Sequence, residues 1–327
     1  MSSDTPVAVP AGERRKPRRQ CADAVLMVRP ASFGYNPETA ATNKFQQQPG
    51  DAAAEAAAAR REFDGLAGAL VGEGVRVCVV EDTIDPQKPD AVFPNNWVSF
   101  HEDGTVVLYP MQPESRRHER RGEVVDEVTS RLGFKVSRLL NLTSHEKHGR
   151  YLEGTGSLVL DHIARTAYAC ISSRTHAAVV QEWARELGYE PIVFNAFDRS
   201  GVPLYHTNVL MCLGERVAIV GTEAIVAADR GPIIERLRAT GREVVELGHA
   251  EVERFGGNML ELGTWDEALG DYRVLVMSET ARHALSAEAF ARLSACTDEV
   301  LAVPIPTIER LGGGSVRCML AEVFLPS

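Results

Sequence analysis

Short apolar runs recur along the chain, and four of them begin at a small or amide residue. These runs start at Asn96, Gly156, Asn208 and Asn258. Each run is followed by a turn and a second apolar run, which is the pattern of two adjacent strands joined as a hairpin. The second strands are expected at 105–109, 166–171, 216–220 and 272–277.

A helical stretch and a third strand follow each hairpin. One helix shows apolar residues at spacings of three and four, typical of a single buried face, at Ala178, Val179, Trp183, Ala184 and Leu187. Gly133, Gly188 and Gly241 stand just before three of the closing strands, where helices commonly end in a left-handed residue. The closing strands are expected at 134–139, 189–194, 242–247 and 299–303. The repeating unit is therefore ββαβ.

A fifth copy of the unit is split between the two ends of the chain. Residues 25–28 predict a strand, the alanine-rich stretch 51–71 a helix, and 75–80 the closing strand. The missing hairpin partner is the apolar run 318–324. A C-terminal strand that completes the first unit would close a ring and remove an exposed sheet edge. We therefore expect an α/β ring of five units, forming one domain over residues 21–327.

Composition and charge narrow the classes of partner. The 327 residues are 44% hydrophobic and carry a net charge of −10, as in many globular proteins. An acidic chain without a basic stripe argues against nucleic acid, and no apolar run reaches the length of about 20 residues that spans a membrane. Residues 1–20 are rich in proline and arginine and lack the apolar segment of a secretory signal. We expect a disordered basic tail there, and a cytoplasmic protein with reduced thiols; a homodimer is left open.

Residues that bear chemistry concentrate where the units begin. Glu153 precedes the third unit, His206 opens the fourth, and Cys318 follows three glycines. Since the same end of every unit points to the ring axis, these three residues should converge. A thiol, an imidazole and a carboxylate are the parts of an activated cysteine nucleophile, with His206 as base and acid and Glu153 supporting it. The remaining cysteines lack such a setting or zinc spacing, and we interpret them as structural: Cys21, Cys78, Cys170, Cys212 and Cys296.

Three segments resemble, in order and context, the catalytic segments of the guanidine-modifying pentein enzymes. They are Leu152–Gly154, Tyr205–Asn208 and Gly312–Met319. This group includes arginine deiminase, dimethylarginine dimethylaminohydrolase and the amidinotransferases, and the resemblance covers residues 21–326. It implies a five-bladed α/β propeller that works without a metal or an organic cofactor.

Within this group, Met27–Pro30 and Pro94–Trp97 are most similar to the amidinotransferase-like branch linked with citrulline use. The stretch 31–50 is long for a connection, a property typical of lids, and is a lid candidate.

The resemblance also implies residues that hold the head group of an amino-acid substrate. Asp90 resembles an aspartate that binds the α-amino group. Arg174 and the pair Arg116 and Arg117 resemble arginines that clamp the α-carboxylate, which a planar guanidinium can bind through two hydrogen bonds.

Three amides depart from the pattern of the relatives that bind a guanidinium. Acidic residues of those relatives are replaced here by Asn95 and Asn96, and arginine deiminase has an aspartate where Asn208 stands. A buried guanidinium needs carboxylate partners, whereas an amide both donates and accepts hydrogen bonds. We therefore expect a substrate whose side-chain end is neutral or only partly charged, such as the ureido group of citrulline.

The predicted activity is cysteine-dependent hydrolysis of a C–N bond in a guanidino or ureido amino acid. The thiolate of Cys318 would attack the central carbon, His206 would protonate the leaving nitrogen, and water would resolve a covalent thio-intermediate. Whether ammonia or the amine leaves stays open. Two alternatives also remain: an amidinotransferase, in which an acceptor amine replaces water, and a non-catalytic pentein that binds a small molecule.

Overall fold

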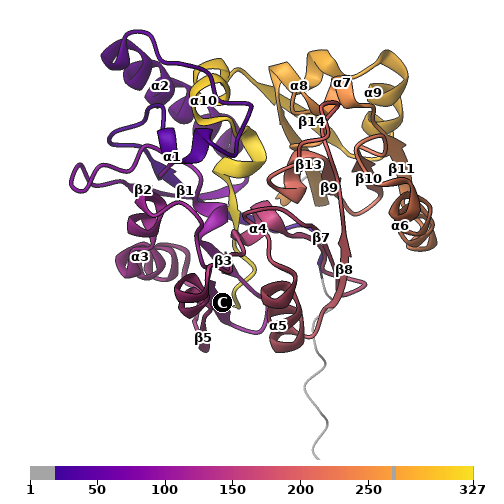
Figure 1. Cartoon of the computed structure of the whole chain (residues 1–327), viewed down its shortest axis with the longest axis horizontal. Helices are drawn as coiled ribbons and strands as arrows, with labels where there is room; N and C mark the ends of the chain where they lie inside the picture. Colours follow the sequence, from indigo (N-terminus) through magenta and orange to yellow (C-terminus); the bar gives the residue numbers. More distant parts are fainter. Residues whose placement is uncertain (1–18, 267–269, 327) are drawn as a thin grey trace, which may run out of the picture.

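The structure is a computed structural model that describes residues 19–266 and 270–326, with the backbone alone at 265 and 266. Its strands form five three-stranded sheets that follow one another around the molecule (Figure 1). In sheet order within the successive units, the strands are β15 (Ala321–Glu322), β1 (Ala24–Arg29) and β2 (Arg76–Glu81); β3 (Val98–Phe100), β4 (Thr105–Leu108) and β5 (Arg138–Asn141); β6 (Val159–Asp161), β7 (Thr166–Cys170) and β8 (Glu190–Phe194); β9 (Met211–Leu213), β10 (Val217–Val220) and β11 (Glu243–Glu246); and β12 (Leu260–Asp266), β13 (Gly270–Ser278) and β14 (Glu299–Val303).

Every sheet has the same internal pattern. The middle strand runs antiparallel to its hairpin partner and parallel to the closing strand, as β4 does between β3 and β5. A parallel closing strand needs a crossover, and helices supply it. The helices of these crossovers are α2 (Ala52–Gly72), α3 (Gly122–Leu132), α5 (Ala177–Leu187), α6 (Ala227–Ala239), α8 (Glu279–Ala284) and α9 (Ala287–Ser294). The predicted ββαβ unit is confirmed.

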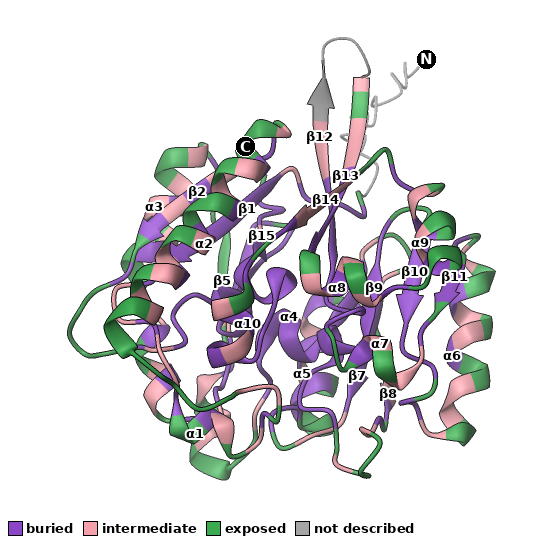
Figure 2. Ribbon diagram, turned by 90° about the horizontal axis from the view of Figure 1, so that it is seen from above, coloured by how far each residue is buried: buried purple, intermediate pink, exposed green. Residues whose placement is uncertain are grey.

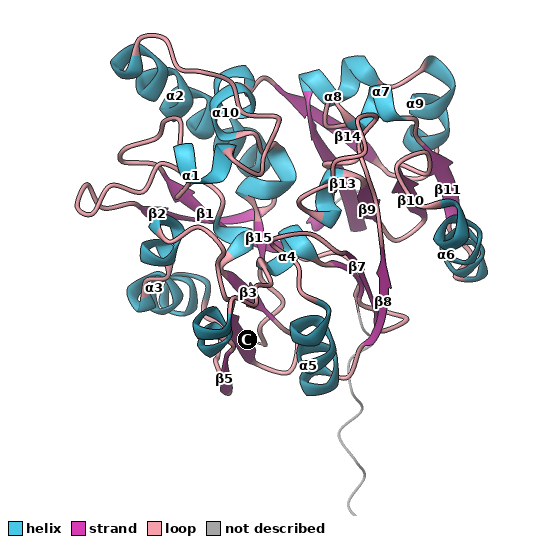
Figure 3. Cartoon of the chain, viewed as in Figure 1, coloured by secondary structure: helices cyan, strands magenta, loops and turns pink. Residues whose placement is uncertain are grey.

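Further short helical elements lie in the connections within and between these units. The helices are α1 (Pro37–Ala40), α4 (Gly154–Ser157), α7 (His249–Val252) and α10 (Pro306–Gly312), and the 3₁₀ turns are η1 (Pro94–Asn96), η2 (Ser115–Glu119), η3 (Thr143–His148), η4 (Thr207–Val209) and η5 (Val316–Met319). In Figure 3 the crossover helices lie around the outside of the strands, whereas α4 lies near the middle.

The split fifth unit is confirmed, although its C-terminal strand is shorter than predicted. β15 pairs antiparallel with β1, placing Glu322 opposite Val25, and a bridge from Val323 to Phe100 reaches the next sheet. The yellow C-terminal segment accordingly lies beside the indigo N-terminal strands in Figure 1. The predicted strand 318–324 is wrong at its start, because Cys318 lies in η5, where its N–H donates to Ser315 O at 2.9 Å.

Helix α5 shows how the apolar spacing determines packing. Val179, Trp183 and Leu187 are buried, and the helix ends at Gly188 in a left-handed conformation with φ 70°. The face is rotated slightly from the predicted one, since Ala178 is exposed and Val180 is buried instead. Figure 2 shows the same division elsewhere, with green outer faces on the helices and purple inner strands.

Four boundaries differ from those expected. The closing strand predicted at 134–139 is β5, at 138–141, because residues 135 and 137 first donate backbone hydrogen bonds to Pro326 O and Gly104 O. The runs that were expected to start as strands at Asn96, Gly156 and Asn208 start instead as one turn of helix.

In the described part of the chain, no helix combines the length and apolarity that crossing a membrane requires.

Gln20 joins three parts of the ring. The predicted tail lies mostly at residues 1–18, outside the described residues, but Gln20 is buried. Its Nε2 donates to Leu160 O at 3.0 Å and Leu213 O at 3.1 Å, and its Oε1 accepts from His162 N at 3.0 Å. The tail boundary at residue 20 is therefore too late, because this side chain belongs to the packed interior.

We predict that Gln20→Ala lowers the free energy of unfolding by about 3 kcal/mol, because it leaves several buried polar groups without partners. Urea unfolding followed by circular dichroism measures this. The exposed Gln48→Ala should change stability by no more than about 0.5 kcal/mol. Equal stabilities of the two variants would contradict the role assigned to Gln20.

Candidate active site

A small cavity lies where the beginnings of several units meet. Six of the residues expected to act at the site line it: Asp90, Asn96, Arg116, Arg174, His206 and Cys318. The walls also include residues that the sequence did not single out as site residues, namely Thr39, Asn43, Phe93 and Tyr205, together with the three glycines 312–314. Segments far apart in the chain thus form one small site.

The predicted carboxylate–imidazole pair is present. His206 lies just before η4, and its Nε2 is 2.9 Å from Oε2 of Glu153, which lies just before α4. Oε1 of Glu153 accepts from Gln112 N at 3.0 Å, so the carboxylate is held from both sides. With Nε2 occupied in this way, Nδ1 is the ring nitrogen left for proton transfer.

Burial and neighbouring charges set the protonation of this pair. Burial disfavours the charged form of Glu153, but Arg174 and His206 outweigh it and lower the pKa of Glu153 to about 2. Burial lowers the pKa of His206 to about 4, although Glu153 opposes this shift. At neutral pH the site therefore holds a carboxylate beside a neutral imidazole, which can accept a proton.

Two glycines let the chain pack closely around His206. A Cβ on Gly156 would collide with Asn96 Nδ2 and lie 2.8 Å from His206 Nδ1. Gly154 has φ 48°, in the left-handed region, and approaches the backbone oxygen of Asn95. Glycine is needed at both positions because a side chain would push these polar groups apart.

The sulfur of Cys318 faces two side-chain amides. Asn208 Nδ2 lies 3.6 Å from Sγ and Asn258 Nδ2 lies 3.4 Å from it. Asn208 was predicted as a substrate-binding residue, whereas Asn258 was not predicted at the site. The available signal was its place at the start of a repeated run, equivalent to Asn96 and Asn208.

The guanidinium of Arg116 is bound mainly by other side chains of the protein. It makes a two-pronged ion pair with Glu119 (Nε–Oε1 2.9 Å, Nη2–Oε2 2.8 Å) and donates through Nη1 to Asn96 Oδ1 at 2.8 Å. Burial raises the pKa of Glu119 to about 7 despite this arginine. Arg116 thus lines the cavity mainly as a support for its wall.

Arg174 links the carboxylate of Glu153 to the segment 31–50, which contributes Thr39 and Asn43 to the cavity wall and is called the covering segment below. Its Nη1 lies 3.5 Å from Glu153 Oε2, and Nη2 donates to Thr39 O at 2.9 Å and Thr42 Oγ1 at 2.7 Å. Asp90 accepts from Asn36 at 2.7 Å through Oδ2, and burial raises the pKa of Asp90.

Two predicted residues lie away from the cavity wall. Arg117 is partly exposed and lies near Glu114 and Glu146, each at 3.4 Å. Asn95 is buried behind the wall, and its side-chain oxygen and nitrogen have no hydrogen-bond partner among the described residues. The pairing of Arg116 with Arg117 in one clamp is therefore not what the geometry shows, because the two side chains point to different surroundings.

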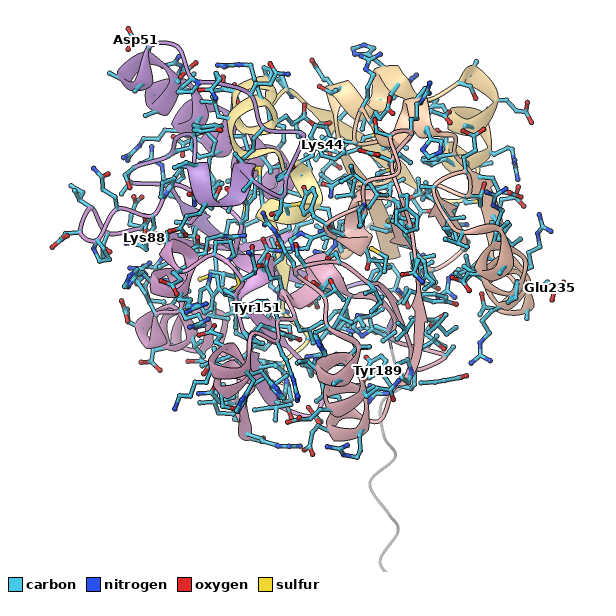
Figure 4. All side chains as sticks on the ribbon, viewed as in Figure 1. Lys44, Asp51, Lys88, Tyr151, Tyr189 and Glu235 are labelled. Carbon is cyan, nitrogen blue, oxygen red and sulfur yellow. The ribbon has the colours of Figure 1, made fainter. Side chains whose placement is uncertain are left out.

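The lid candidate 31–50 lies against the site. Asn43 Nδ2 donates to Gly313 O at 3.0 Å, and Gln46 Nε2 donates to Gly312 O at 3.0 Å. Lys44, labelled in Figure 4, pairs with Asp198 at 3.1 Å on the far side of the segment. The glycines before Cys318 are thus packed against the covering segment rather than left open.

All six cysteines are free. Burial raises the pKa of Cys170 and Cys212 to about 12, which suits a structural role. Within residues 19–266 and 270–326, no group of three His, Cys, Asp or Glu side chains is arranged to hold a metal ion.

Comparison with known proteins agrees with this geometry. The model of the eukaryotic N,N dimethylarginine dimethylhydrolase family matches residues 29–325. The chain belongs to this family. As a member it is a pentein hydrolase of amidine C–N bonds that acts on guanidino groups. No curated protein sequence matches the chain.

Solved structures show the pentein fold. The N-terminal domain of ArgZ, an arginine dihydrolase from the ornithine–ammonia cycle in cyanobacteria, has a TM-score of 0.68 at 18% identity over 92% of this chain and 99% of its own. A dimethylarginine dimethylaminohydrolase adduct has a TM-score of 0.60 at 16% identity, covering 92% and 99%. An AgrE mutant with L-arginine has a TM-score of 0.66 at 18% identity, and the chain spans 40% of it.

The buried imidazole predicts how this family member responds to acid. The pKa of His206 is about 4 when folded against 6.5 when free, so its contribution is present above pH 6.5 and is lost as pH falls towards 4. Between pH 7 and pH 5 the wild type should lose about 2 kcal/mol more stability than His206→Asn, which cannot titrate. Urea unfolding at both pH values measures this, with the exposed His118→Asn expected to behave as wild type. Parallel losses in all three proteins would contradict the prediction.

Proposed function

We propose that the chain is a cysteine-dependent hydrolase that cleaves a C–N bond of an arginine-type amino acid through a covalent thio-intermediate. The observation that carries this proposal is that Cys318 and His206 line the same cavity, with Glu153 Oε2 lying 2.9 Å from Nε2 of His206. An activated cysteine needs a base within reach and a third group that orients this base.

The protonation of the free site supports the first step. Neutral His206 takes the proton of the Cys318 thiol through Nδ1, and Glu153 stabilises the resulting imidazolium. The thiolate forms a bond to the central carbon of the substrate group. The C–N bond then breaks, and the leaving nitrogen receives the proton from His206.

Water completes the cycle by the reverse use of the same groups. His206 removes a proton from water, the oxygen attacks the carbon of the thio-intermediate, and the C–S bond breaks with its electrons on sulfur. If the covalent group is a carbamoyl, hydrolysis ends in carbon dioxide and ammonia. An amidino group gives a urea instead.

The cavity also holds charged groups that suit the head of an amino acid. Asp90 offers a buried carboxylate for an α-ammonium group, and the neighbouring contacts from Asn36 and Thr39 use Oδ2. Arg174 is the better candidate for the α-carboxylate, because Arg116 is bound at both prongs by the carboxylate of Glu119, whereas Arg174 approaches a carboxylate, that of Glu153, only at 3.5 Å. The covering segment 31–50 would exclude water from the bound substrate.

We predict that the protein releases ammonia or an amine from one or more of arginine, methylated arginines and citrulline. Cys318→Ser should reduce kcat at least about 1,000-fold, because the hydroxyl is a far weaker nucleophile. Cys296→Ser, which changes a cysteine outside the cavity, should retain wild-type activity. Intact-mass spectrometry of the acid-quenched wild type with substrate should show a covalent adduct, and Cys318→Ser should show none.

Other outcomes of this assay support the alternatives. Transfer of the group to an added amine, in place of hydrolysis, would identify an amidinotransferase. Binding of arginine or citrulline without turnover by the wild type would identify a binding protein.

We further propose that the reacting end of the preferred substrate is neutral. Asn96 Oδ1 is occupied by Arg116, whereas its buried Nδ2 has no hydrogen-bond partner among the described residues. An unpaired buried donor is satisfied by an acceptor such as a ureido oxygen, and a guanidinium offers no acceptor. The family nevertheless acts on guanidino groups, so arginine is the relevant competitor.

We predict a higher kcat/KM for citrulline than for arginine. Asn96→Asp keeps the acceptor for Arg116 and replaces the donor with a negative oxygen, so it should shift the ratio of kcat/KM towards arginine by at least about tenfold, or 1.4 kcal/mol. Asn141→Asp, on the outer strand β5, is the matched control. Better turnover of arginine by the wild type would overturn the neutral substrate but not the cysteine hydrolase.

A further inference from the structure

Two carboxamides converge on the sulfur of Cys318 from neighbouring units. Asn258 Nδ2 is 3.4 Å from Sγ and Asn208 Nδ2 is 3.6 Å from it. The two asparagines are fully buried, and Cys318 is 3% exposed. Amide hydrogens at this range are donors to sulfur, and a donor to an ionised acceptor is markedly stronger than one to a neutral acceptor.

The neighbours of Asn258 determine which way its amide points. Arg317 N donates to Asn258 Oδ1 at 3.1 Å, which identifies the oxygen. Nδ2 donates one hydrogen to Asn208 O at 2.9 Å and directs the other towards Sγ. A flipped amide would set its oxygen against the carbonyl of Asn208 and its NH₂ group against the N–H of Arg317.

The orientation of the Asn208 amide is fixed by fewer contacts, but this amide also turns its nitrogen towards the sulfur. Its Nδ2 is nearer to Sγ than its Oδ1, which lies at 4.0 Å. Its position corresponds to that of Asn258 in the next unit, immediately before the first strand of the hairpin. The repeat therefore delivers the same functional group twice to one sulfur.

We propose that Asn208 and Asn258 form an amide cradle for the sulfur anion of Cys318. This inference rests on the proposed function, in which Cys318 is the nucleophile. When the S–H bond breaks, the proton passes to His206 Nδ1 and the electron pair remains on Sγ, where both amides donate to it. The same donors receive the charge again when the C–S bond of the thio-intermediate breaks. Asn208 thereby acts on the nucleophile and not on the ureido end of the substrate.

The test is the pH dependence of Cys318 alkylation by iodoacetamide, measured at that residue by peptide mass spectrometry. Asn258→Asp keeps the acceptor for Arg317 N and places a negative oxygen beside the sulfur. We expect the pH of half-maximal alkylation to rise by about one unit and the rate at pH 7 to fall about tenfold. Asn208→Ala, which loses the longer contact, should shift in the same direction by less. Asn141→Asp is the control and should follow the wild type.

A purely structural role for Asn258 would lower thermal stability without moving this pH profile. Wild-type profiles for both variants would therefore overturn the cradle. If Asn258→Asp does not fold, Asn208→Ala decides alone, since it keeps the backbone carbonyl that Asn258 binds: an upward shift supports the cradle and an unchanged profile overturns it.

Alkylation separates this inference from the proposed function, because it requires no turnover. Full activity of Cys318→Ser would overturn the hydrolase mechanism and the cradle's catalytic role together. A shifted profile in a protein that turns over no substrate would support the cradle and contradict only the hydrolase.

Discussion

The site depends on the contacts that the carboxylate of Glu153 makes with Gln112, His206 and Arg174. Its two oxygens hold the backbone of Gln112 and the ring of His206, and Arg174 joins Oε2 to the covering segment through Thr39. Removing one member of a buried charged group leaves an unpaired charge, which costs about 3–5 kcal/mol. The ring of His206 and the segment 31–50 are thus linked through one carboxylate and Arg174.

Asymmetry within a symmetrical ring explains how such a site arises. The five units share one topology, but the residues at their starts differ: Asn96 faces Arg116, Gly156 gives room to His206, and Asn208 and Asn258 face the sulfur. Equivalent backbone positions therefore have different roles: Asn96 forms part of the cavity wall, Gly156 leaves room for His206, and Asn208 and Asn258 donate to the sulfur of Cys318. The side chains lining the small cavity at the axis are largely buried, and hydrogen bonds and charges act strongly in such surroundings.

Much of this was predictable because it depends on local pattern. The spacing of apolar residues on α5, the glycine that ends that helix and the split first unit all follow from rules that act within a few turns of chain. The convergence of Glu153, His206 and Cys318 also followed, because one end of every repeat faces the axis. The contacts of Arg116 and Arg117 did not, since adjacent residues on a 3₁₀ turn point to different sides and sequence distance does not reveal which side is buried.

By itself, the sequence determined the repeating unit, the number of units and the junctions at which chemistry gathers, because these are set by periodicity along the chain. Only the tertiary structure decided which polar groups are partners. Glu119 forms an ion pair with Arg116, Asn258 donates to Cys318, which lies 60 residues away in the sequence, and Gln20 donates to Leu160 O in the interior. Such pairings depend on distances between units that no local pattern records, and burial then makes each of them strong.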